Sequence, residues 1–346
     1  MPLKVLIRTP NHLGDCIMAL PMISEAGEAY RGASITLLTP QHLADLFETN
    51  PGIDAIIRIP SDYVHGLIAV VKIRDLVASG EYDIGYILPP SFGSAAAFKL
   101  AGVKERIGYI ADGRRLLLSR PLAPPTPLNS EHRSELYFNL LRRGAGVELE
   151  YTRPKLFLND DDTLRARDIL ARFGVSPGDP YAVLAFRAVA ESRRWGTENY
   201  TELTKALVAR HDLKVVLIGS EADRPEGDRI AAAADSGQAV NLAGKTGLRV
   251  SAAVLAGARF FVGNDSGPAH LAAAVGIPII VLSGADNPKA TSPVTPHKRL
   301  IYLEHLDCIS CEKNKCPLSG DSSMQCMRHI TLEMVLAVVE ELVGRV

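Results

Sequence analysis

The stretch ARFFVGNDSGPAHLAAAVGIPIIVLSGADNP, residues 258–288, decides the fold of this chain. The apolar run at 259–262 predicts a buried strand, residues 263–267 a tight turn, and the small residues 268–275 a helix. A second buried strand is expected at 277–282. In such a unit, backbone N–H groups and the positive end of the helix dipole lie beneath an anionic group. The stretch therefore predicts an α/β domain, with either an anion site or only a capped helix at this turn.

The turn carries the candidate residues Asp265, Ser266, Gly267 and His270. Asp265 or Ser266 can cap the helix, because their side-chain oxygens can accept hydrogen bonds from N–H groups of the first turn. Pro268 fits that first turn, where no N–H is required. His270 lies one turn beyond Ser266 and therefore on the same face of the helix.

The composition describes a folded chain that is neither disordered nor embedded in a membrane. Its 346 residues suffice for two domains, and 47% are hydrophobic and 22% charged. The net charge of −1 gives no long-range attraction to nucleic acid, so we expect no nucleic-acid partner. The N-terminal apolar run is too short for a signal peptide, and the longest apolar tract, 271–282, is too short to span a bilayer. We therefore expect a cytoplasmic protein, peripheral on a membrane at most.

Strands and helices alternate along the chain, as in a parallel sheet covered by helices on both faces. The first strand is expected at 4–8, and the alternation, which includes a helix at 41–48, pauses at an extended connector, 148–159. It then restarts. The chain therefore predicts two doubly wound, Rossmann-like domains, residues 1–155 and 156–346, the second ending in a C-terminal helix.

An acidic side chain follows the first strand, in the sequence NHLGD at 11–15. Ligands of an open parallel sheet bind at the carboxyl ends of its strands, so Asp15 is expected to face a ligand. A carboxylate there can act as general base on a sugar hydroxyl, or it can cap the helix that begins beside it. His12 is either an accessory residue of the site or a solvated loop histidine.

Two loops of the second domain follow strands at the same sheet edge as the turn described above. The first contains Arg193, Arg194 and Trp195. The two arginines can hold a phosphate, whereas the tryptophan is expected to pack the loop. The second contains Glu221 and Asp223, whose carboxylates can accept ribose hydroxyls or cap a helix. Three such loops at one edge indicate a nucleotide site.

Four of the five cysteines gather late in the chain, with the spacing Cys308-x2-Cys311-x4-Cys316-x9-Cys326. An odd total with one late cluster does not fit a secreted disulfide framework. Four thiolates are enough for a tetrahedral metal, but the spacing lacks the second close pair of an ordinary zinc ribbon. We expect reduced cysteines that pack a loop, with a metal as the alternative.

Four motifs follow one another along nearly the whole chain. They are Arg8-x5-Gly14-Asp15-x5-Pro21, then Arg106-Ile107-Gly108-Tyr109 with Arg114 and Leu116-Leu117-Leu118, then Arg194-Trp195, and finally GNDSGPAHLAAA at 263–274. The last of these is long and specific. With them, and with its cysteine loop, the chain resembles glycosyltransferase family 9, the bacterial ADP-heptose:lipopolysaccharide heptosyltransferases, and most closely the heptosyltransferase II branch.

This resemblance implies the GT-B architecture, two Rossmann-like domains facing each other across a cleft, with the acceptor on the first and the nucleotide-sugar on the second. It implies Asp15 as the catalytic base. It implies that the donor-binding residues are Arg194, Glu221, Asp223, Asp265, Ser266, Gly267 and His270. The acceptor would carry phosphates and acidic sugars. The segment 99–143 suits such an acceptor because it is basic, with nine Lys/Arg and four acids. Its candidate acceptor-binding residues, with His12, are Arg106, Arg114, Arg115 and His132; as exposed charges they can equally be neutral to function.

Two places depart from the family's pattern. Residues 186–188 read Phe-Arg-Ala where the family has Pro-Gly-Ala, and residues 283–286 read Ser-Gly-Ala-Asp where it has Phe-Gly-x-Thr. A carboxylate beside a diphosphate is unfavourable unless Asp286 points elsewhere.

The resemblance implies an inverting transfer of L-glycero-D-manno-heptose from ADP-heptose to the lipopolysaccharide inner core, an acceptor of the heptosyl-Kdo2-lipid A type, with peripheral contact to the inner membrane. The leaving diphosphate would be stabilised by the helix N-terminus, Arg194 and His270, without a cofactor or a divalent metal. Two alternatives stay open: a transferase or epimerase using another nucleotide-sugar, and a non-catalytic nucleotide-sugar-binding protein. A nicotinamide dehydrogenase is not expected, because neither domain has a G-x-G-x-x-G turn after its first strand.

Overall fold

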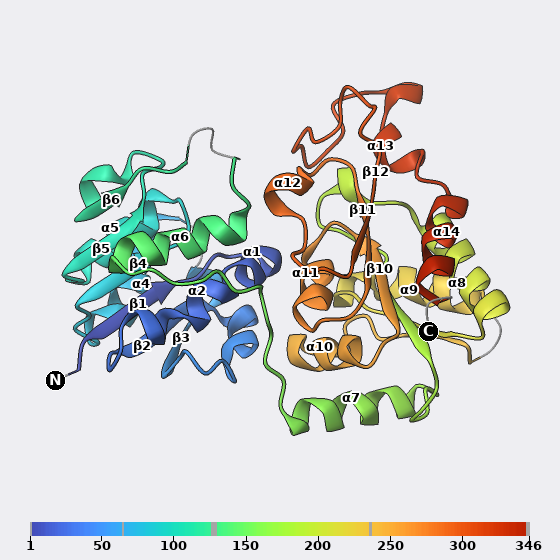
Figure 1. Ribbon diagram of the computed structural model, residues 1–346, viewed down its shortest axis with the longest axis horizontal. Coiled ribbons are helices and arrows are strands. Elements are labelled where there is room, and N and C mark those ends of the chain that lie inside the picture. The colour runs from blue at the N-terminus through green and yellow to red at the C-terminus, as the bar shows by residue number, and fades with distance from the viewer. Residues whose placement is uncertain (1, 64–65, 126–129, 235–236, 344–346) are drawn as a thin grey trace. The chain divides into compact units, whose positions relative to one another are not determined.

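The computed structural model describes residues 2–63, 66–125, 130–234 and 237–343. It divides into two compact units, Met1–Phe157 and Leu158–Val346. Each unit is built on one parallel six-stranded sheet covered by helices, which confirms the expected fold class (Figure 1). Within the described ranges, no helix is long and apolar enough to cross a bilayer.

The elements of the first unit alternate as expected from the sequence. Its strands are β1 (Lys4–Arg8), β2 (Ser34–Pro40), β3 (Ala55–Ile59), β4 (Ile84–Ile87), β5 (Glu105–Tyr109) and β6 (Arg120–Leu122). Its α-helices are α1 (Leu13–Met18), α2 (Leu20–Ser24), α3 (Ala26–Ala29), α4 (Leu67–Ala78), α5 (Phe92–Leu100) and α6 (Arg133–Ala145), and its 3₁₀-helices are η1 (Gln41–Phe47), η2 (Ser61–Tyr63) and η3 (Arg114–Leu117).

The strand order of the first sheet is β3-β2-β1-β4-β5-β6, with every pair parallel. The central strand β1 is apolar because both of its faces are covered, and Val5, Leu6 and Ile7 are fully buried. The order 3-2-1-4-5-6 is that of the doubly wound Rossmann fold. Its switch point, where ligands bind, lies at the carboxyl ends of β1 and β4.

The second unit repeats this alternation of strands and helices. Its strands are β7 (Tyr181–Ala185), β8 (Lys214–Leu217), β9 (Ala239–Asn241), β10 (Phe260–Asn264), β11 (Ile279–Ser283) and β12 (Lys298–Tyr302). Its helices are α7 (Asp160–Arg172), α8 (Thr197–His211), α9 (Arg224–Ala232), α10 (Leu248–Ala256), α11 (Gly267–Ala274), α12 (Pro288–Thr291), α13 (Gln325–Arg328) and α14 (Leu332–Val343), with 3₁₀-helices η4 (Glu191–Arg193), η5 (Glu221–Asp223) and η6 (Gly320–Ser322).

The second sheet has the order β12-β11-β10-β7-β8-β9, again all parallel. Counted from β7, this is the same 3-2-1-4-5-6 order, and its switch point lies at the carboxyl ends of β7 and β10. Gly263 sits in β10 at this point, and a Cβ there would collide with the ring of Phe261 and lie 3.2 Å from the carbonyl of Ala185. Only glycine allows this approach.

Helices α8 and α14 pack against each other over the second sheet (Figure 1). Trp195 lies in the core with them, 3% exposed, as the expectation of a packing role requires. Its ring meets Tyr200 edge-on, and its Nε1 donates to the carbonyl of Ile330 at 2.7 Å. The indole N–H is thereby satisfied within the core.

Two expectations about elements were wrong in detail. The helix expected at 41–48 is the 3₁₀-helix η1. The strands β5, β6 and β9 were not expected, and β6 and β9 are three residues long and lie at sheet edges. Short edge strands tolerate charged residues and proline, as Arg120 and Pro121 in β6 show, so they lack the apolar pattern of buried strands.

Candidate functional site

The loop at the first switch point is built around the buried side chain of Arg8. Arg8 is 2% exposed, and its Nη1 and Nη2 donate to the carbonyl of Thr9 and to Oδ1 of Asn11, both at 2.5 Å. Burial lowers the pKa of Arg8 to about 10, which leaves it charged at neutral pH. A buried guanidinium therefore fixes the turn that leads from β1 into α1.

Asp15 lies in the first turn of α1 and does not cap it. The N-cap residue is His12, which is exposed and makes no capping hydrogen bond through its side chain. The carboxylate of Asp15 is 23% exposed, and its Oδ1 lies 3.5 Å from both Nη1 of Arg133 and the hydroxyl of Tyr137. The capping interpretation is therefore wrong, and Asp15 is partly open beside two side chains of α6.

The turn between β10 and α11 leaves the helix without a side-chain cap. Ser266 is the N-cap residue, but its hydroxyl donates to the carbonyl of Asn264 at 3.2 Å. Asp265 is 4% exposed, and its Oδ2 accepts from the hydroxyl of Ser283 at 2.9 Å. The expectation that Asp265 or Ser266 caps α11 is therefore wrong. First-turn N–H groups of α11 can serve an anion, with His270 buried one turn further on.

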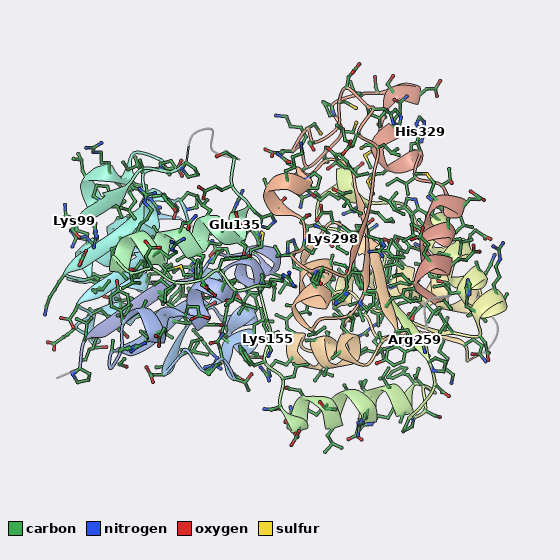
Figure 2. The ribbon with its side chains drawn as sticks, viewed as in Figure 1. Lys99, Glu135, Lys155, Arg259, Lys298 and His329 are labelled. Atoms are coloured by element: carbon green, nitrogen blue, oxygen red, sulfur yellow. The ribbon has the colours of Figure 1, made fainter. Side chains whose placement is uncertain are left out.

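Asp286, which follows β11, is held by an ion pair. Its Oδ1 lies 2.6 Å from Nη2 of Arg193. Burial and the charge of Asp265 raise the pKa of Asp286 to about 7, although Arg193 opposes this. Burial also raises the pKa of Asp265 and lowers that of Lys298, the first residue of β12 (Figure 2). The structure thus gives the unexpected carboxylate of Asp286 a cationic partner.

Arg194 is oriented by the backbone of its own loop. Its Nε donates to the carbonyl of Ala188 at 2.9 Å and its Nη2 to that of Val189 at 3.1 Å. A guanidinium has five N–H donors, so these two bonds fix its direction without using all of its capacity. Arg194 therefore follows β7 at the second switch point in a defined orientation.

The two acids after β8, Glu221 and Asp223, interact with residues of the same turn. Asp223 Oδ2 accepts from the backbone N–H and the hydroxyl of Ser220, at 2.8 and 2.7 Å, in a capping box. Glu221 forms an ion pair with Arg224, and its side chain is 67% exposed. Of the two interpretations of this loop, helix capping describes Asp223, whereas Glu221 stays accessible.

Arg187 was not expected to take part in this site. It stands where the family has a glycine, and its Nη1 lies 2.9 Å from Oε2 of Glu226 and its Nε 3.6 Å from Oδ1 of Asp223. The side chain is 33% exposed. Arg187 thus joins the loop after β7 to the start of α9 and places a further cation at the second switch point.

Two of the arginines expected to bind the acceptor, Arg106 and Arg114, donate hydrogen bonds to backbone carbonyls instead. Arg114 is 1% exposed and donates to the carbonyls of Tyr109, Pro89 and Ile87. Arg106 donates to the carbonyl of Leu117 at 2.8 Å and to those of residues 103 and 104. The expectation of an exposed charge is therefore wrong for Arg114, which ties strand ends together.

The other two candidates differ from each other. Arg115 is exposed on η3. His132 is the N-cap residue of α6, where its Nδ1 accepts from the backbone N–H of Ser134 at 3.2 Å. Of the acceptor candidates, Arg115 and His12 are the ones with exposed side chains.

A family model matches residues 70–320. The match includes the switch point of the second sheet and the end of β4 in the first, but it begins after the loop that follows β1. The description of the family model is glycosyltransferase family 9 (heptosyltransferase). The chain belongs to this family. It is therefore a glycosyltransferase, as the motifs around Asp15 and Asp265 indicated.

Curated members of the family are similar over most of their length. The lipopolysaccharide heptosyltransferase 2 of Escherichia coli strain K12 is 29% identical over 315 residues, 87% of this chain and 88% of that protein. The lipooligosaccharide heptosyltransferase 2 of Haemophilus influenzae is 27% identical over 99% of this chain and all of its own length, 100%. These relatives agree with the resemblance to the heptosyltransferase II branch.

Solved structures of family 9 proteins have the same fold. The E. coli ADP-heptose lipopolysaccharide heptosyltransferase II superposes with a TM-score of 0.81 at 26% identity, covering 99% of each chain. A family 9 glycosyltransferase from Veillonella parvula gives a TM-score of 0.85 at 20% identity, covering 99% of this chain and 98% of its own. The GT-B heptosyltransferase fold is therefore shared along the whole chain.

Proposed function

We propose that this protein transfers L-glycero-D-manno-heptose from ADP-heptose to the inner core of lipopolysaccharide, with inversion at the anomeric carbon. The observation that carries the proposal is the N-terminus of α11, which has no side-chain cap and follows the buried Asp265 at a switch point. Such a helix end stabilises the negative charge of a leaving diphosphate. The names of the E. coli and H. influenzae relatives support the heptosyl group and the lipopolysaccharide class of acceptor.

In the proposed reaction, Asp15 is the general base. Its carboxylate removes the proton of an acceptor hydroxyl while that oxygen forms a bond to the anomeric carbon and the bond to the ADP oxygen breaks. The partial exposure of Asp15 supports this role, because a base must reach a substrate. Arg133 and Tyr137, both 3.5 Å away, would hold the carboxylate in position.

The donor would bind to the second unit. N–H groups of Ser266 and Gly267 face the diphosphate in this proposal, with the unused donors of Arg194 and the ring of His270 beside them. Glu221 is the more accessible of the two acids after β8 and would accept the ribose hydroxyls, while Asp223 holds the turn. The leaving group needs no divalent metal in this arrangement, because helix end and guanidinium supply the positive charge.

The acceptor would bind to the first unit, close to Asp15. Arg115 and His12 supply exposed polar groups for the phosphates and acidic sugars of a heptosyl-Kdo2-lipid A type of acceptor. Arg106, Arg114 and His132 would shape this surface through their bonds to the backbone. Because such an acceptor is a lipid, we place the protein in the cytoplasm with peripheral contact to the inner membrane.

The proposal is tested with purified protein, ADP-heptose and a heptose-bearing inner-core acceptor, by measuring ADP release and the product. We expect the wild-type protein to turn over, and Asp15→Asn to lower kcat by about 10²- to 10⁴-fold with little change in donor binding, since a general base acts in the transition state. Asp75→Asn is the matched control, because Asp75 is an exposed acid on α4 of the same unit. Turnover of Asp15→Asn close to that of the control would show that Asp15 is not the base.

A further inference from the structure

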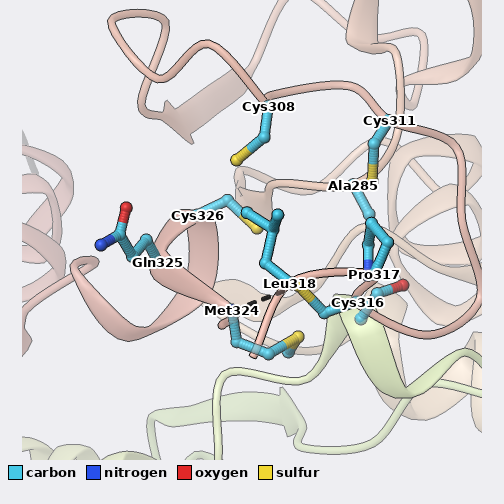
Figure 3. A pocket seen from close by; sticks show the side chains of 10 residues that line it. Ala285, Cys308, Cys311, Cys316, Pro317, Leu318, Met324, Gln325 and Cys326 are labelled. Atoms are coloured by element: carbon cyan, nitrogen blue, oxygen red, sulfur yellow. Dashed lines mark hydrogen bonds between the residues drawn. The ribbon is translucent and has the colours of Figure 1, made fainter. Parts of the chain in front are cut away.

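The late cysteines lie in a loop of the second unit. Four free thiols line a cavity of about 20 Å³ there, namely those of Cys308, Cys311, Cys316 and Cys326 (Figure 3). Among the residues that the structure describes, no three His, Cys, Asp or Glu side chains are placed to hold a metal ion. This geometry favours the expected packing of the loop over a metal site. A different part of the molecule, on the first unit, has exposed side chains that the proposed reaction does not use.

One face of the first unit exposes several large apolar side chains. In the described part of the chain ten large hydrophobic side chains are exposed, and five of them lie on α4, α5 and η3. We call these five the apolar face; they are Ile68, Val71, Phe92, Leu100 and Leu116, with exposed fractions from 45% for Val71 to 85% for Leu116. Scattered single residues of this kind are ordinary, whereas a group on neighbouring elements marks an interaction surface.

The three elements that carry the apolar face pack against one another. Helix α4 contacts α5, and α5 contacts η3. A Cβ on Gly93, in the first turn of α5, would lie 3.4 Å from Cγ2 of Val70 on α4. Arg114 of η3 donates to the carbonyl of Ile87 at 3.4 Å, and Ile87 is the last residue of β4, the strand that leads into α5. The five side chains therefore belong to one continuous layer.

Helical periodicity turns these side chains away from the core. On α4, Ile73 is packed in the core, whereas Ile68 and Val71, three residues apart, lie on the exposed side. On α5, Phe92 and Lys99 are seven residues apart, so they share one exposed side of that helix. The exposed side of an ordinary surface helix is polar, so apolar residues at these positions indicate a partner.

Two cations accompany the apolar face. Lys99 on α5 and Arg115 on η3 are exposed, and neither has an ion-pair partner within the described ranges (Figure 2). Asp75, the acid on the exposed side of α4, is paired with Arg74 at 2.5 Å. Against the two cations stands the exposed Asp112, which precedes η3. The surface is therefore apolar with a small excess of positive charge, which suits an anionic interface.

The apolar face lies toward the sheet edge that holds the candidate base. Helices α4 and α5 begin after the carboxyl ends of β3 and β4, and Asp15 follows β1 at the same edge of the same sheet. Ile68 and Val71 lie in the first two turns of α4, and Phe92 is the first residue of α5. A partner that covers this face therefore reaches the edge at which the acceptor is proposed to bind.

We propose that the apolar face docks on a bilayer whose surface contains anionic phospholipids. Its side chains enter the boundary between headgroups and acyl chains, while Lys99 and Arg115 contact lipid phosphates. The inference rests on the proposed function, because a lipid-borne acceptor lies in the same bilayer on which the enzyme docks. Docking brings the sugars of the acceptor to the sheet edge of Asp15 and gives the peripheral contact a defined surface.

Sedimentation with vesicles tests this surface without any donor or acceptor. We expect the full-length wild-type protein to bind vesicles of phosphatidylcholine and phosphatidylglycerol. The double variant Phe92→Ser, Leu116→Ser should bind about tenfold more weakly, because two apolar side chains no longer leave water. The matched control is Leu164→Ser, Met334→Ser, which removes two exposed apolar side chains from α7 and α14 of the second unit and should bind like the wild type. Circular dichroism verifies that both double variants fold.

A second comparison isolates the charge. The wild type should bind the mixed vesicles more tightly than vesicles of phosphatidylcholine alone, and added salt should reduce the excess through screening. Lys99→Gln should lose part of this excess, whereas Lys99→Arg, which keeps the charge, should retain it.

The proposal is overturned if the wild type fails to bind the mixed vesicles, or if the double variant of the apolar face binds as tightly as the control. A wild type that is dimeric by light scattering, with a monomeric Phe92→Ser, Leu116→Ser variant, would assign the face to a second copy of the chain and overturn it as well. The proposed function fails separately, if the protein transfers no heptose to a detergent-dispersed inner-core acceptor.

Discussion

At the scale of single residues, Asp286 stands where the family pattern has a threonine, and it adds a negative charge to the proposed donor site. Its carboxylate forms an ion pair with Arg193, at 2.6 Å, and would therefore not lie unpaired beside a diphosphate. The pKa of Asp286, raised to about 7 by burial and by Asp265, makes its charge depend on pH near neutrality. Proton uptake at Asp286 would remove a negative charge and release Arg193 toward the donor.

We therefore predict that KM for ADP-heptose rises as the pH increases from about 6 to about 8. The sign follows because Asp286 loses its proton over this range, so repulsion of the diphosphate grows. In Asp286→Asn, which cannot ionise, this rise should flatten severalfold. The measurement is KM as a function of pH, with Asp307→Asn, an exposed acid of the same unit, as control. Equal slopes in wild type and Asp286→Asn would refute this role.

The sequence predicted which residues follow the strand ends better than it predicted what surrounds each side chain. Asp15, Asp265 and Arg194 all lie at the carboxyl ends of strands, as motif and strand position indicated. That Arg114 is buried on three carbonyls could not be predicted, because a basic residue near a motif looks alike in sequence whether it meets solvent or backbone. The partners Arg133 and Tyr137 were missed for the same reason, although their spacing of four puts them on one helix face.

At the scale of elements, α7 and α10 are joined by a buried ion pair. Arg249 on α10 donates from Nε to Oδ1 of Asp162 at 2.9 Å and contacts Oδ2 as well, with side chains 9% and 7% exposed. Asp162 also completes the capping box with Asn159 at the start of α7. Although burial opposes it, these bonds lower the pKa of Asp162.

We predict that Asp162→Asn destabilises the second unit by about 3–5 kcal/mol at neutral pH, because it leaves Arg249 buried without its counterion. A lowered folded-state pKa means that this stability is present above the unfolded pKa of Asp and is lost as the pH falls through the folded value. The difference between wild type and variant should therefore vanish in acid.

Urea unfolding followed by the fluorescence of Trp195 measures this effect, since Trp195 is the single tryptophan and is buried in the second unit. Asp161→Asn is the control, because its pair with Arg165 is exposed and should contribute less than about 1 kcal/mol. A variant as stable as this control, or a difference that persists in acid, contradicts the assigned pair.

Elements were predictable where both faces of a strand are covered. β1 begins and ends where the apolar pattern placed it, whereas β6 and β9, at sheet edges, left no such pattern. The segment Gln41–Phe47 is a 3₁₀-helix, η1, and its composition does not distinguish this tighter winding from that of an α-helix.

At the scale of the whole molecule, the chain contains the same strand order twice, β3-β2-β1-β4-β5-β6 and β9-β8-β7-β10-β11-β12. Each order creates one switch point, and the candidate base follows a strand at one of them while the candidate diphosphate site follows a strand at the other. Alternating strands and helices predicted this duplication. The choice of nucleotide and sugar depends on side-chain contacts with a substrate, which strand order does not determine.

The central claim is that ADP-heptose is the donor, and a comparison of donors tests it most directly. Wild-type protein is incubated with an inner-core acceptor and, separately, with ADP-heptose, ADP-hexoses, UDP-sugars and GDP-sugars, and the glycolipid is analysed by mass spectrometry. We predict that ADP-heptose adds one heptosyl residue to the acceptor, with a kcat/KM at least about tenfold above every other donor. A clear preference for a UDP- or GDP-sugar, or binding of ADP-heptose without any transfer, would contradict the account.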